Sequence, residues 1–252
     1  MKRCIKSNLF LFIVLMASIF SVAGESLKIV TIEVAPFGFT GSDGKPAGMM
    51  FDISNLIAEE AGLKYTNKIV PYARTVIELQ SGNADFVLRF DNDKLGAIAV
   101  PVASVISFPI IVLSRAGSTF KALKKLHGKT VGVVRGGEFD RNFDNDSAIN
   151  KYDTNDYSQM IKMLIRGRLD AGIGTNIGLY YNASKLGIKP EVFSPPMNLS
   201  SKEFLLHFSK INSNGKTISR LKGTVEKLKK NGEIKKIVNK YMGRFKWDIS
   251  TK

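Results

Sequence analysis

The clearest pattern of hydrophobic and polar positions lies near the start of the chain, at residues 27–65. Apolar and β-branched residues dominate positions 29–34, which predicts a buried strand. Pro36 ends this run, and the sequence GSDGK at 41–45 has the composition of a turn. The pattern therefore predicts a strand that leads into a wide turn.

A change of period then predicts a helix. From Phe51 the apolar spacing changes from two residues to about 3.6, and Gly62 stands where a helix commonly ends. A second strand is expected at 65–70. Strand, turn, helix and strand in this order form a βαβ unit, in which ligands bind at the carboxyl ends of the strands. The loop from Glu33 to Gly48 is therefore a candidate part of a binding site.

The same order of elements recurs further along the chain. The segments ELQSGNADFVL (78–88) and LIRGRLDAGI (164–173) each place an exit glycine and an aspartate between a helix and a strand. Two similar α/β units are expected, joined by the nearly uncharged, Val- and Ile-rich segment 97–114. We expect a polar loop at 91–96, and two helices separated by Asn231-Gly232 near the end of the chain.

The N-terminal residues have the pattern of a secretory signal peptide. Three basic residues precede an apolar run at 9–23, and small residues follow, which predicts cleavage near Gly24. A transmembrane anchor, the alternative, needs about 20 apolar residues. The only cysteine, Cys4, lies in the segment to be removed, so the mature chain is expected to have no disulfide and no cysteine metal site.

Positive charge is concentrated at the C-terminal end. Removal of the signal segment leaves 34 basic and 22 acidic residues, and residues 210–252 alone hold 13 basic and three acidic ones. A basic chain suggests nucleic acid as a partner, but export and the lack of interleaved aromatic residues argue against it. We interpret the charge as a solvated helix face, with attraction to an anionic membrane surface as a weaker alternative.

Six segments in series resemble the signatures of the family 3 extracellular solute-binding proteins, the periplasmic components of polar amino-acid ABC importers. They are PFGF, DGKPAGMMFDI, ELQSGNADF, HGKTVGVVRGG, RGRLDA and VEKLKKNGEIKKIVNKYMG. The resemblance implies an α/β periplasmic binding protein type II fold, in which two doubly wound lobes close on a ligand about two crossover strands. It assigns residues 1–24 to the signal peptide, 25–112 plus 200–252 to lobe 1, and 113–199 to lobe 2. It also implies a periplasmic monomer without cofactor that delivers a small polar ligand to an ABC permease.

The chain departs from the family pattern at several positions that contact ligand. Val34 stands where the amino-acid binders have an aromatic residue, and Lys94 stands roughly where an arginine grips the ligand carboxylate. Thr175 replaces the aspartate that binds the ligand amino group, and Gly137-Glu138 replaces the usual Ser/Thr pair. These departures argue against an ordinary α-amino acid as the ligand.

The expected binding residues combine positions that match the family pattern with charged residues at strand ends and helix starts. The matching positions are Asp52, Tyr72 at the usual aromatic clamp position, and the Gly136-Gly137 turn. Arg135 and the exposed amides of the RGGEFD turn suit an anionic group. For each charged residue a structural salt bridge is an equal alternative. The ligand is expected to be small and polar, to carry a negative group and to lack the usual need for an α-ammonium. A cationic ligand received by Asp52 and Glu33 is the alternative. The expected ligand-binding residues are Glu33, Asp52, Tyr72, Arg74, Arg89, Arg135, Gly136, Gly137 and Thr175.

Two other functions remain open from the sequence. One is a periplasmic sensor subunit that presents its ligand state to a membrane signalling protein. The other is a dehydratase-like enzyme on the same fold, for which Glu33 or Glu138 would be the acid/base. His127 and His207 have no nearby carboxylate cluster, so no metal site is expected. Hydrolase and nucleotide-binding motifs are absent from the sequence.

Overall fold

The structure is a computed structural model that describes residues 26–242. The expected signal peptide at 1–24, with Cys4, lies outside the described residues. No helix within residues 26–242 has both the length and the hydrophobicity needed to cross a membrane. The strands are β1 (Leu27–Ile32), β2 (Phe39–Thr40), β3 (Pro46–Ala47), β4 (Tyr65–Val70), β5 (Phe86–Phe90), β6 (Ala99–Ser114), β7 (Thr130–Val134), β8 (Asn150–Thr154), β9 (Ala171–Thr175) and β10 (Met197–Ser209).

Eight α-helices and two short 3-10 helices accompany these strands in the described part of the chain. They are α1 (Met49–Glu60), α2 (Arg74–Gln80), α3 (Asp93–Ile98), η1 (Leu123–Leu126), α4 (Arg141–Asn145), α5 (Tyr157–Ile165), α6 (Asn176–Lys185), η2 (Pro190–Val192), α7 (Gly215–Lys230) and α8 (Glu233–Met242).

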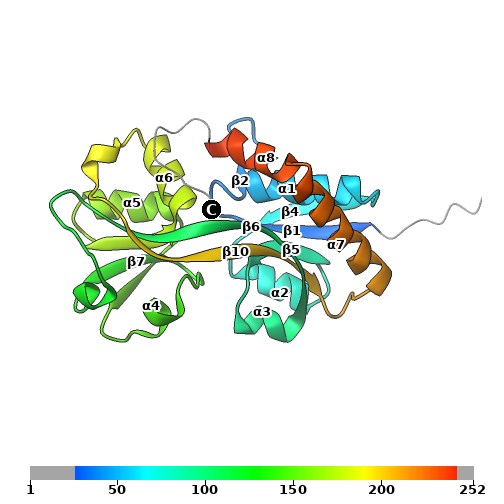
Figure 1. The fold of residues 1–252 in the computed structure, drawn as a ribbon, viewed down its shortest axis with the longest axis horizontal. Coiled ribbons are helices and arrows are strands. Elements are labelled where there is room, and N and C mark those ends of the chain that lie inside the picture. Colours follow the sequence, from blue (N-terminus) through cyan, green and yellow to red (C-terminus); the bar gives the residue numbers. More distant parts are fainter. Residues whose placement is uncertain (1–25, 243–252) are drawn as a thin grey trace, which may run out of the picture.

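One eight-stranded sheet runs through the whole molecule in the order β4-β1-β5-β10-β6-β9-β7-β8. The pairs on each side are parallel, β1 with β4 and β5, and β7 with β8 and β9. The two long strands β6 and β10 lie antiparallel in the middle and connect the two lobes (Figure 1). Strand β10 pairs with β5 in one lobe, and β6 pairs with β9 in the other. The lobes are therefore joined by a continuous ribbon of backbone hydrogen bonds.

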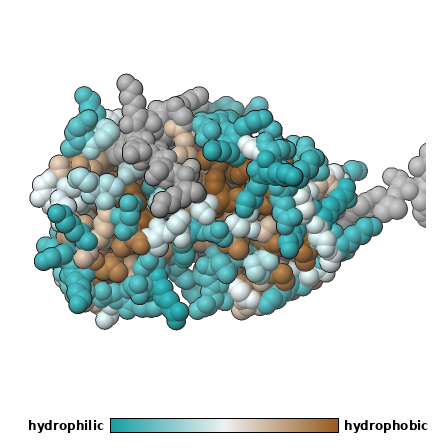
Figure 2. All heavy atoms as spheres, viewed as in Figure 1, coloured by the Kyte–Doolittle hydropathy of each residue, from teal (hydrophilic) through white to brown (hydrophobic). Residues whose placement is uncertain are grey.

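The helices bury their apolar faces against this sheet. In α1 the buried residues recur at helical spacing and include Met50, Ile53 and Ile57, as the sequence period predicts. Helices α7 and α8 cover the same lobe, and Figure 2 shows hydrophilic residues over their outer face. Their buried residues are confined to one side and include Leu221, Val225 and Val238. The basic C-terminal segment thus combines an apolar inner face with a charged, solvated outer face.

The expected two-lobe α/β fold is confirmed, but two local predictions were wrong. The polar segment at 91–96 is not a loop, because most of it belongs to the helix α3. The Asn92 side chain caps this helix by accepting a hydrogen bond from the Leu95 amide at 2.9 Å. Strand β8 was not predicted at all. Four of its five residues are exposed, so it lacks the alternation that marks a half-buried strand.

The second lobe is inserted into the first between the two connecting strands, β6 and β10. The chain leaves β6 at Ser114 and returns at Ser194, whose amide donates to the Ser114 carbonyl at 3.0 Å. Ala116 donates to the Val192 carbonyl at 2.8 Å beside an isolated bridge between Arg115 and Phe193. The entry and exit of the insertion therefore lie side by side.

Candidate ligand-binding site

A small apolar cavity of about 20 Å³ lies between the lobes. It has room for about one water molecule. Both lobes contribute residues where parallel strands reach their carboxyl ends. The lining consists of Ile32, Val34, Phe37, Tyr72, Phe90 and Phe204 on the first lobe's side, and Val134, Gly137, Phe139 and Tyr157 from the second lobe. This is the place at which an α/β sheet of this kind binds a ligand.

A cluster of aromatic rings forms the floor of the cavity on the first lobe. The Phe204 ring on β10 lies 4.4 Å from the Phe90 ring and 4.8 Å from the Phe37 ring, measured between centroids. Phe108 on β6 packs edge-on against Phe204 at 5.9 Å. Rings from both connecting strands thus support the cavity, and tilted contacts at these distances are favourable.

Tyr72 is positioned by the fully buried side chain of Arg89. The Arg89 guanidinium carbon lies 4.1 Å from the centre of the Tyr72 ring. Its Nη1 donates to the Thr75 hydroxyl at 2.7 Å and to the Tyr72 carbonyl at 3.3 Å. Nε has no partner in the described part of the chain, and no carboxylate there forms an ion pair with Arg89. The charge is stabilised by a ring, a hydroxyl and a carbonyl.

The Gly136-Gly137 turn brings the second lobe close to Tyr72. Gly136 has a φ of 76°, and a Cβ there would lie 3.7 Å from Tyr72 Cδ1. At Gly137 a Cβ would lie only 2.8 Å from the Phe139 ring and 2.9 Å from the Val134 carbonyl. Both positions therefore favour glycine, the first for its backbone conformation and the second for space.

Tyr157 and Thr175 form the second lobe's side of the site. The Tyr157 hydroxyl accepts a hydrogen bond from the Thr175 amide at 3.2 Å, and burial raises the pKa of Tyr157 to about 12. Its ring lies against Gly174 and Gly178, where a Cβ would clash with it. The Thr175 hydroxyl accepts from the Gly178 amide at 3.0 Å and so caps α6. Thr175 itself does not line the cavity.

Direct contacts hold the two lobes together around the cavity. Asn182 on α6 donates from Nδ2 to the Ala35 carbonyl of the first lobe at 2.8 Å. The rings of Phe39 and Tyr181 face each other across the lobes at 6.1 Å. Lys202 on the connecting strand β10 donates to the Glu138 carbonyl at 2.7 Å. The structure therefore represents a closed arrangement of the lobes.

The structure places the nine expected binding residues in different surroundings. Tyr72 and Gly137 line the cavity, and Gly136 adjoins it. Arg89 lies behind Tyr72, and Thr175 lies under Tyr157. The remaining four are not brought to the cavity.

Three of these four form contacts within one lobe. Asp52 Oδ2 accepts hydrogen bonds from Lys240 Nζ at 2.8 Å and from the Tyr241 hydroxyl at 2.9 Å. Arg74 forms an ion pair with Glu78 at 2.8 Å, as the structural alternative expected. Arg135 is largely exposed and lies 3.9 Å from Asp153. Glu33 is exposed, and its side chain has no hydrogen bond or ion pair with the described residues.

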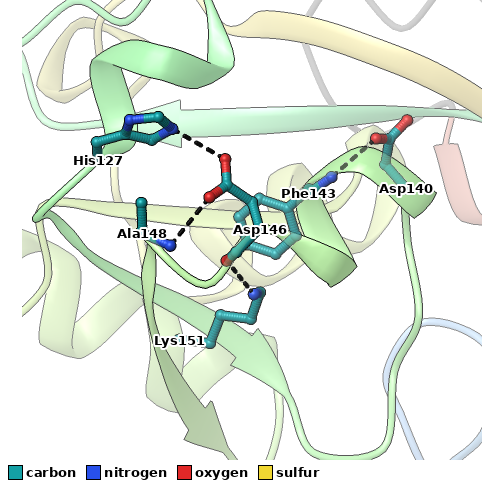
Figure 3. Close-up of polar contacts among 6 residues, drawn as sticks. All are labelled: His127, Asp140, Phe143, Asp146, Ala148 and Lys151. Carbon is teal, nitrogen blue, oxygen red and sulfur yellow. Dashed lines mark hydrogen bonds and ion pairs between the residues drawn. The ribbon is translucent and has the colours of Figure 1, made fainter.

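A polar cluster of the second lobe lies beside the ends of η1 and α4 and on β8 (Figure 3), and none of its residues lines the cavity. Asp146 accepts from the Ala148 amide at 3.0 Å and pairs with His127 Nε2 at 2.9 Å, and both contacts lower the pKa of Asp146. Lys151 donates to the Asp146 carbonyl at 2.7 Å. Within residues 26–242 no three His, Cys, Asp or Glu side chains are arranged to hold a metal ion.

Most of the cavity lining was missed from the sequence. Phe90, Phe139, Tyr157 and Phe204 have the spacing and hydrophobicity of ordinary core residues, so nothing distinguishes them in the sequence. Val34 and Phe37 are exceptions. Phe37 belongs to the PFGF segment that follows the first strand, and Val34 stands where the family's amino-acid binders have an aromatic residue.

Comparison with known proteins shows the family of this molecule. The sequence pattern of the bacterial extracellular solute-binding proteins, family 3, matches residues 27–244. The chain belongs to this family. A relative of this family 3 protein, the probable amino-acid-binding protein YxeM of Bacillus subtilis strain 168, is 22% identical over 212 residues, covering 82% of this chain and 79% of YxeM.

Solved structures show the same fold as this family 3 protein. A histidine kinase sensor domain with similarity to periplasmic binding proteins has a TM-score of 0.75 at 17% identity, over 87% of this chain and 97% of that one. The substrate-binding protein of an amino acid ABC transporter has a TM-score of 0.70 at 19% identity, over 86% of this chain and 98% of that one. The expected two-lobe, type II fold is thereby confirmed.

Proposed function

We propose that this family 3 protein captures a small molecule between its lobes in the periplasm and delivers it to an ABC importer. The observation that carries the proposal is the interlobe cavity, which is lined from both lobes at the carboxyl ends of parallel strands. Export by residues 1–24 and a monomeric state are parts of the same proposal. The named relatives bind or sense ligands, and none is described as an enzyme.

Closure on the ligand is the proposed means of recognition. In the closed arrangement the cavity holds about one water, so a larger ligand enters only when the lobes separate. The contacts of Asn182 and Tyr181 with the first lobe then have to break and re-form. Such motion about connecting strands is a hinge closure.

A sensor role is the second candidate, because the fold matches a histidine kinase sensor domain as well as a transporter component. In that role the same closure would report ligand to a membrane signalling protein. The delivery and sensing roles are distinguished by affinity capture, in which the immobilised mature protein is used to recover its partner from solubilised membranes. Recovery of a permease supports delivery, and recovery of a kinase or cyclase supports sensing.

The binding proposal itself is tested by mass spectrometry of whatever the purified protein releases on denaturation. We expect one small molecule in near-stoichiometric amount, which on addition to stripped protein raises Tm. At 100 times its Kd, a ligand adds about 2.7 kcal/mol to the free energy of unfolding. Conversion of that molecule into a product by the native protein would instead indicate an enzyme.

A further inference from the structure

The cavity lining has no charged side chain. All ten lining residues are aliphatic, aromatic or glycine, and the phenol groups of Tyr72 and Tyr157 are their only polar side-chain groups. The ammonium group of an amino acid needs a carboxylate partner when water is excluded, because an unpaired buried charge is costly. This lining offers none.

Thr175 stands where the family's amino-acid binders have the aspartate that holds the ligand amino group, and it makes other contacts here. Thr175 is fully buried, and its hydroxyl accepts the hydrogen bond that caps α6. The Tyr157 ring and hydroxyl lie beside it and separate it from the cavity. Restoring an ammonium site would therefore require an acidic group that no lining residue supplies.

A buried positive charge lies directly behind the lining. The Arg89 guanidinium lies 4.1 Å from the Tyr72 ring centre and makes no ion pair with a described carboxylate. A like charge placed in the cavity would be repelled, and water cannot enter between them to screen the repulsion. The surroundings thus disfavour a cationic ligand. The attraction of Arg89 offsets part of the desolvation cost of an anionic ligand, and a neutral ligand meets neither cost.

We propose that the ligand is a small molecule with a flat, apolar ring and no ammonium group, which packs against Tyr72 as the lobes close over it. The proposal rests on the proposed binding function and specifies its ligand class. Tyr72, Phe139 and Tyr157 supply ring surfaces from both lobes, and aromatic groups pack favourably in offset or tilted contacts. In the closed arrangement these side chains leave space for about one water molecule.

Calorimetric titration with four matched compounds tests the ligand class. All four compounds contain one phenyl ring. Phenylpropionate carries a carboxylate, phenylpropanol a hydroxyl, phenethylamine an ammonium, and L-phenylalanine both an ammonium and a carboxylate. We expect phenylpropionate or phenylpropanol to bind at least about tenfold more tightly than both ammonium compounds, because only the latter bury an unpaired cation. Equal or tighter binding of L-phenylalanine or phenethylamine would overturn the ligand class.

Binding of none of the four would overturn it as well. In either case the proposed binding function is still supported if the denatured protein releases a different small molecule, such as a zwitterionic amino acid. The binding function is contradicted only if mass spectrometry finds no released ligand.

Two neighbouring valines on β7 locate the binding site. Val134 lines the cavity, whereas Val133, equally buried on the same strand, does not. Val134→Thr places a hydroxyl in the cavity and is expected to weaken binding of the preferred compound about three- to tenfold. Val133→Thr is the matched control and should leave affinity unchanged once both variants are shown to fold. Unchanged affinity in Val134→Thr, or equal losses in both variants, would contradict the placement.

Discussion

Arg89 is the most unusual side chain of the molecule, because its guanidinium is only 1% exposed and lacks a carboxylate partner among the described residues. Removing a charge from water costs several kcal/mol unless the protein supplies compensating contacts. The Tyr72 ring, the Tyr72 carbonyl and the Thr75 hydroxyl supply them here. Arg89, the penultimate residue of β5, therefore connects this strand to the loop that carries Tyr72.

Two substitutions separate the charge of Arg89 from its volume. Arg89→Met keeps most of the volume and removes the charge, so we expect it to change the free energy of unfolding by less than about 1 kcal/mol. Arg89→Ala leaves a cavity and should cost about 2–4 kcal/mol. Urea unfolding measures both. Equal losses in the two variants would show that the charge, and not the filling of space, stabilises this position.

His207 predicts a dependence of stability on pH. Burial lowers the pKa of His207 from 6.5 to about 4, against the opposing effect of the nearby Asp91 carboxylate and with a smaller lowering effect of the Arg89 charge. Between these two values the unfolded chain binds a proton that the folded chain does not, so stability falls as the pH falls. The loss amounts to at most about 3 kcal/mol over this range.

The variant His207→Leu should remove this loss, since both ring nitrogens lack hydrogen-bond partners in the described structure and an apolar side chain fits the same place. His127→Gln is the control, because His127 is the other histidine and is 44% exposed. Urea denaturation at a series of pH values between 7 and about 4 measures the free energy of unfolding of each variant. If the free energy of unfolding fell equally with falling pH in wild type and in His207→Leu, the prediction would be contradicted.

Only part of the candidate site could be predicted at the residue scale. Tyr72 and Gly137 were found because each follows a strand end and matches a family motif. Arg74, Arg89 and Arg135 were expected at the cleft because charges at strand ends commonly serve ligands. In the structure Arg74 forms an ion pair with Glu78, Arg89 is buried against the Tyr72 ring, and Arg135 is largely exposed beside Asp153. These surroundings depend on tertiary packing, which a single sequence does not show.

At the scale of elements, the sequence predicted best where apolar periodicity was strong. Helix α1 and strands β1 and β4 were expected close to their observed bounds. Helix α1 buries apolar residues at helical spacing, β1 is an almost wholly buried apolar run, and β4 alternates between half-buried and exposed residues over most of its length. Helix α3 was missed because it has a single buried residue, Leu95, and forms through the Asn92 cap. Strand β8 was missed because it is an exposed edge strand whose pairing with β7 alone defines it.

Helix α8 is held in place by its last turn. The Tyr241 hydroxyl donates to Asp52 on α1 and accepts from the Gly48 amide at 3.0 Å. Burial and the contact with Asp52 raise the pKa of Tyr241. One phenol thus joins the last turn of the described chain to the start of the first helix.

We expect Tyr241→Phe to lower the free energy of unfolding by about 2 kcal/mol, because two hydrogen bonds are lost and one involves a carboxylate. Lys240→Met removes the other Asp52 contact, but the lysine side chain is 67% exposed. It should cost less than about 1 kcal/mol. Urea unfolding measures both variants, and a larger loss in Lys240→Met would show that the ion pair dominates.

The whole molecule is organised by the continuous sheet. Strands β6 and β10 pair along most of their length, with register shifts near Ser200, Leu205 and His207. We therefore expect the proposed closure to occur by twisting of this ribbon and not about a flexible loop. Closure is then decided by contacts on the far side of the cavity. The hydrogen bond from Asn182 to the Ala35 carbonyl is the most direct of these.

Asn182→Ala should shift the ligand-free protein toward the open arrangement. The loss of one interlobe hydrogen bond, worth about 1 kcal/mol, changes the ratio of open to closed molecules about fivefold. Small-angle X-ray scattering should show a larger radius of gyration. Asn176→Ala on the same helix is the control, since the Asn176 side chain bonds only within α6. An unchanged radius in Asn182→Ala would show that this hydrogen bond does not set the balance.

The insertion of the second lobe also constrains the order in which the protein can be completed during synthesis. Strand β10 lies between β5 and β6, so both edges remain unpaired until residues 197–209 have been made. The second lobe, by contrast, is one unbroken segment whose two ends meet at Ser114 and Ser194. A nascent chain can therefore finish its second lobe before its first, and a product truncated before β10 would expose two open sheet edges to neighbouring chains.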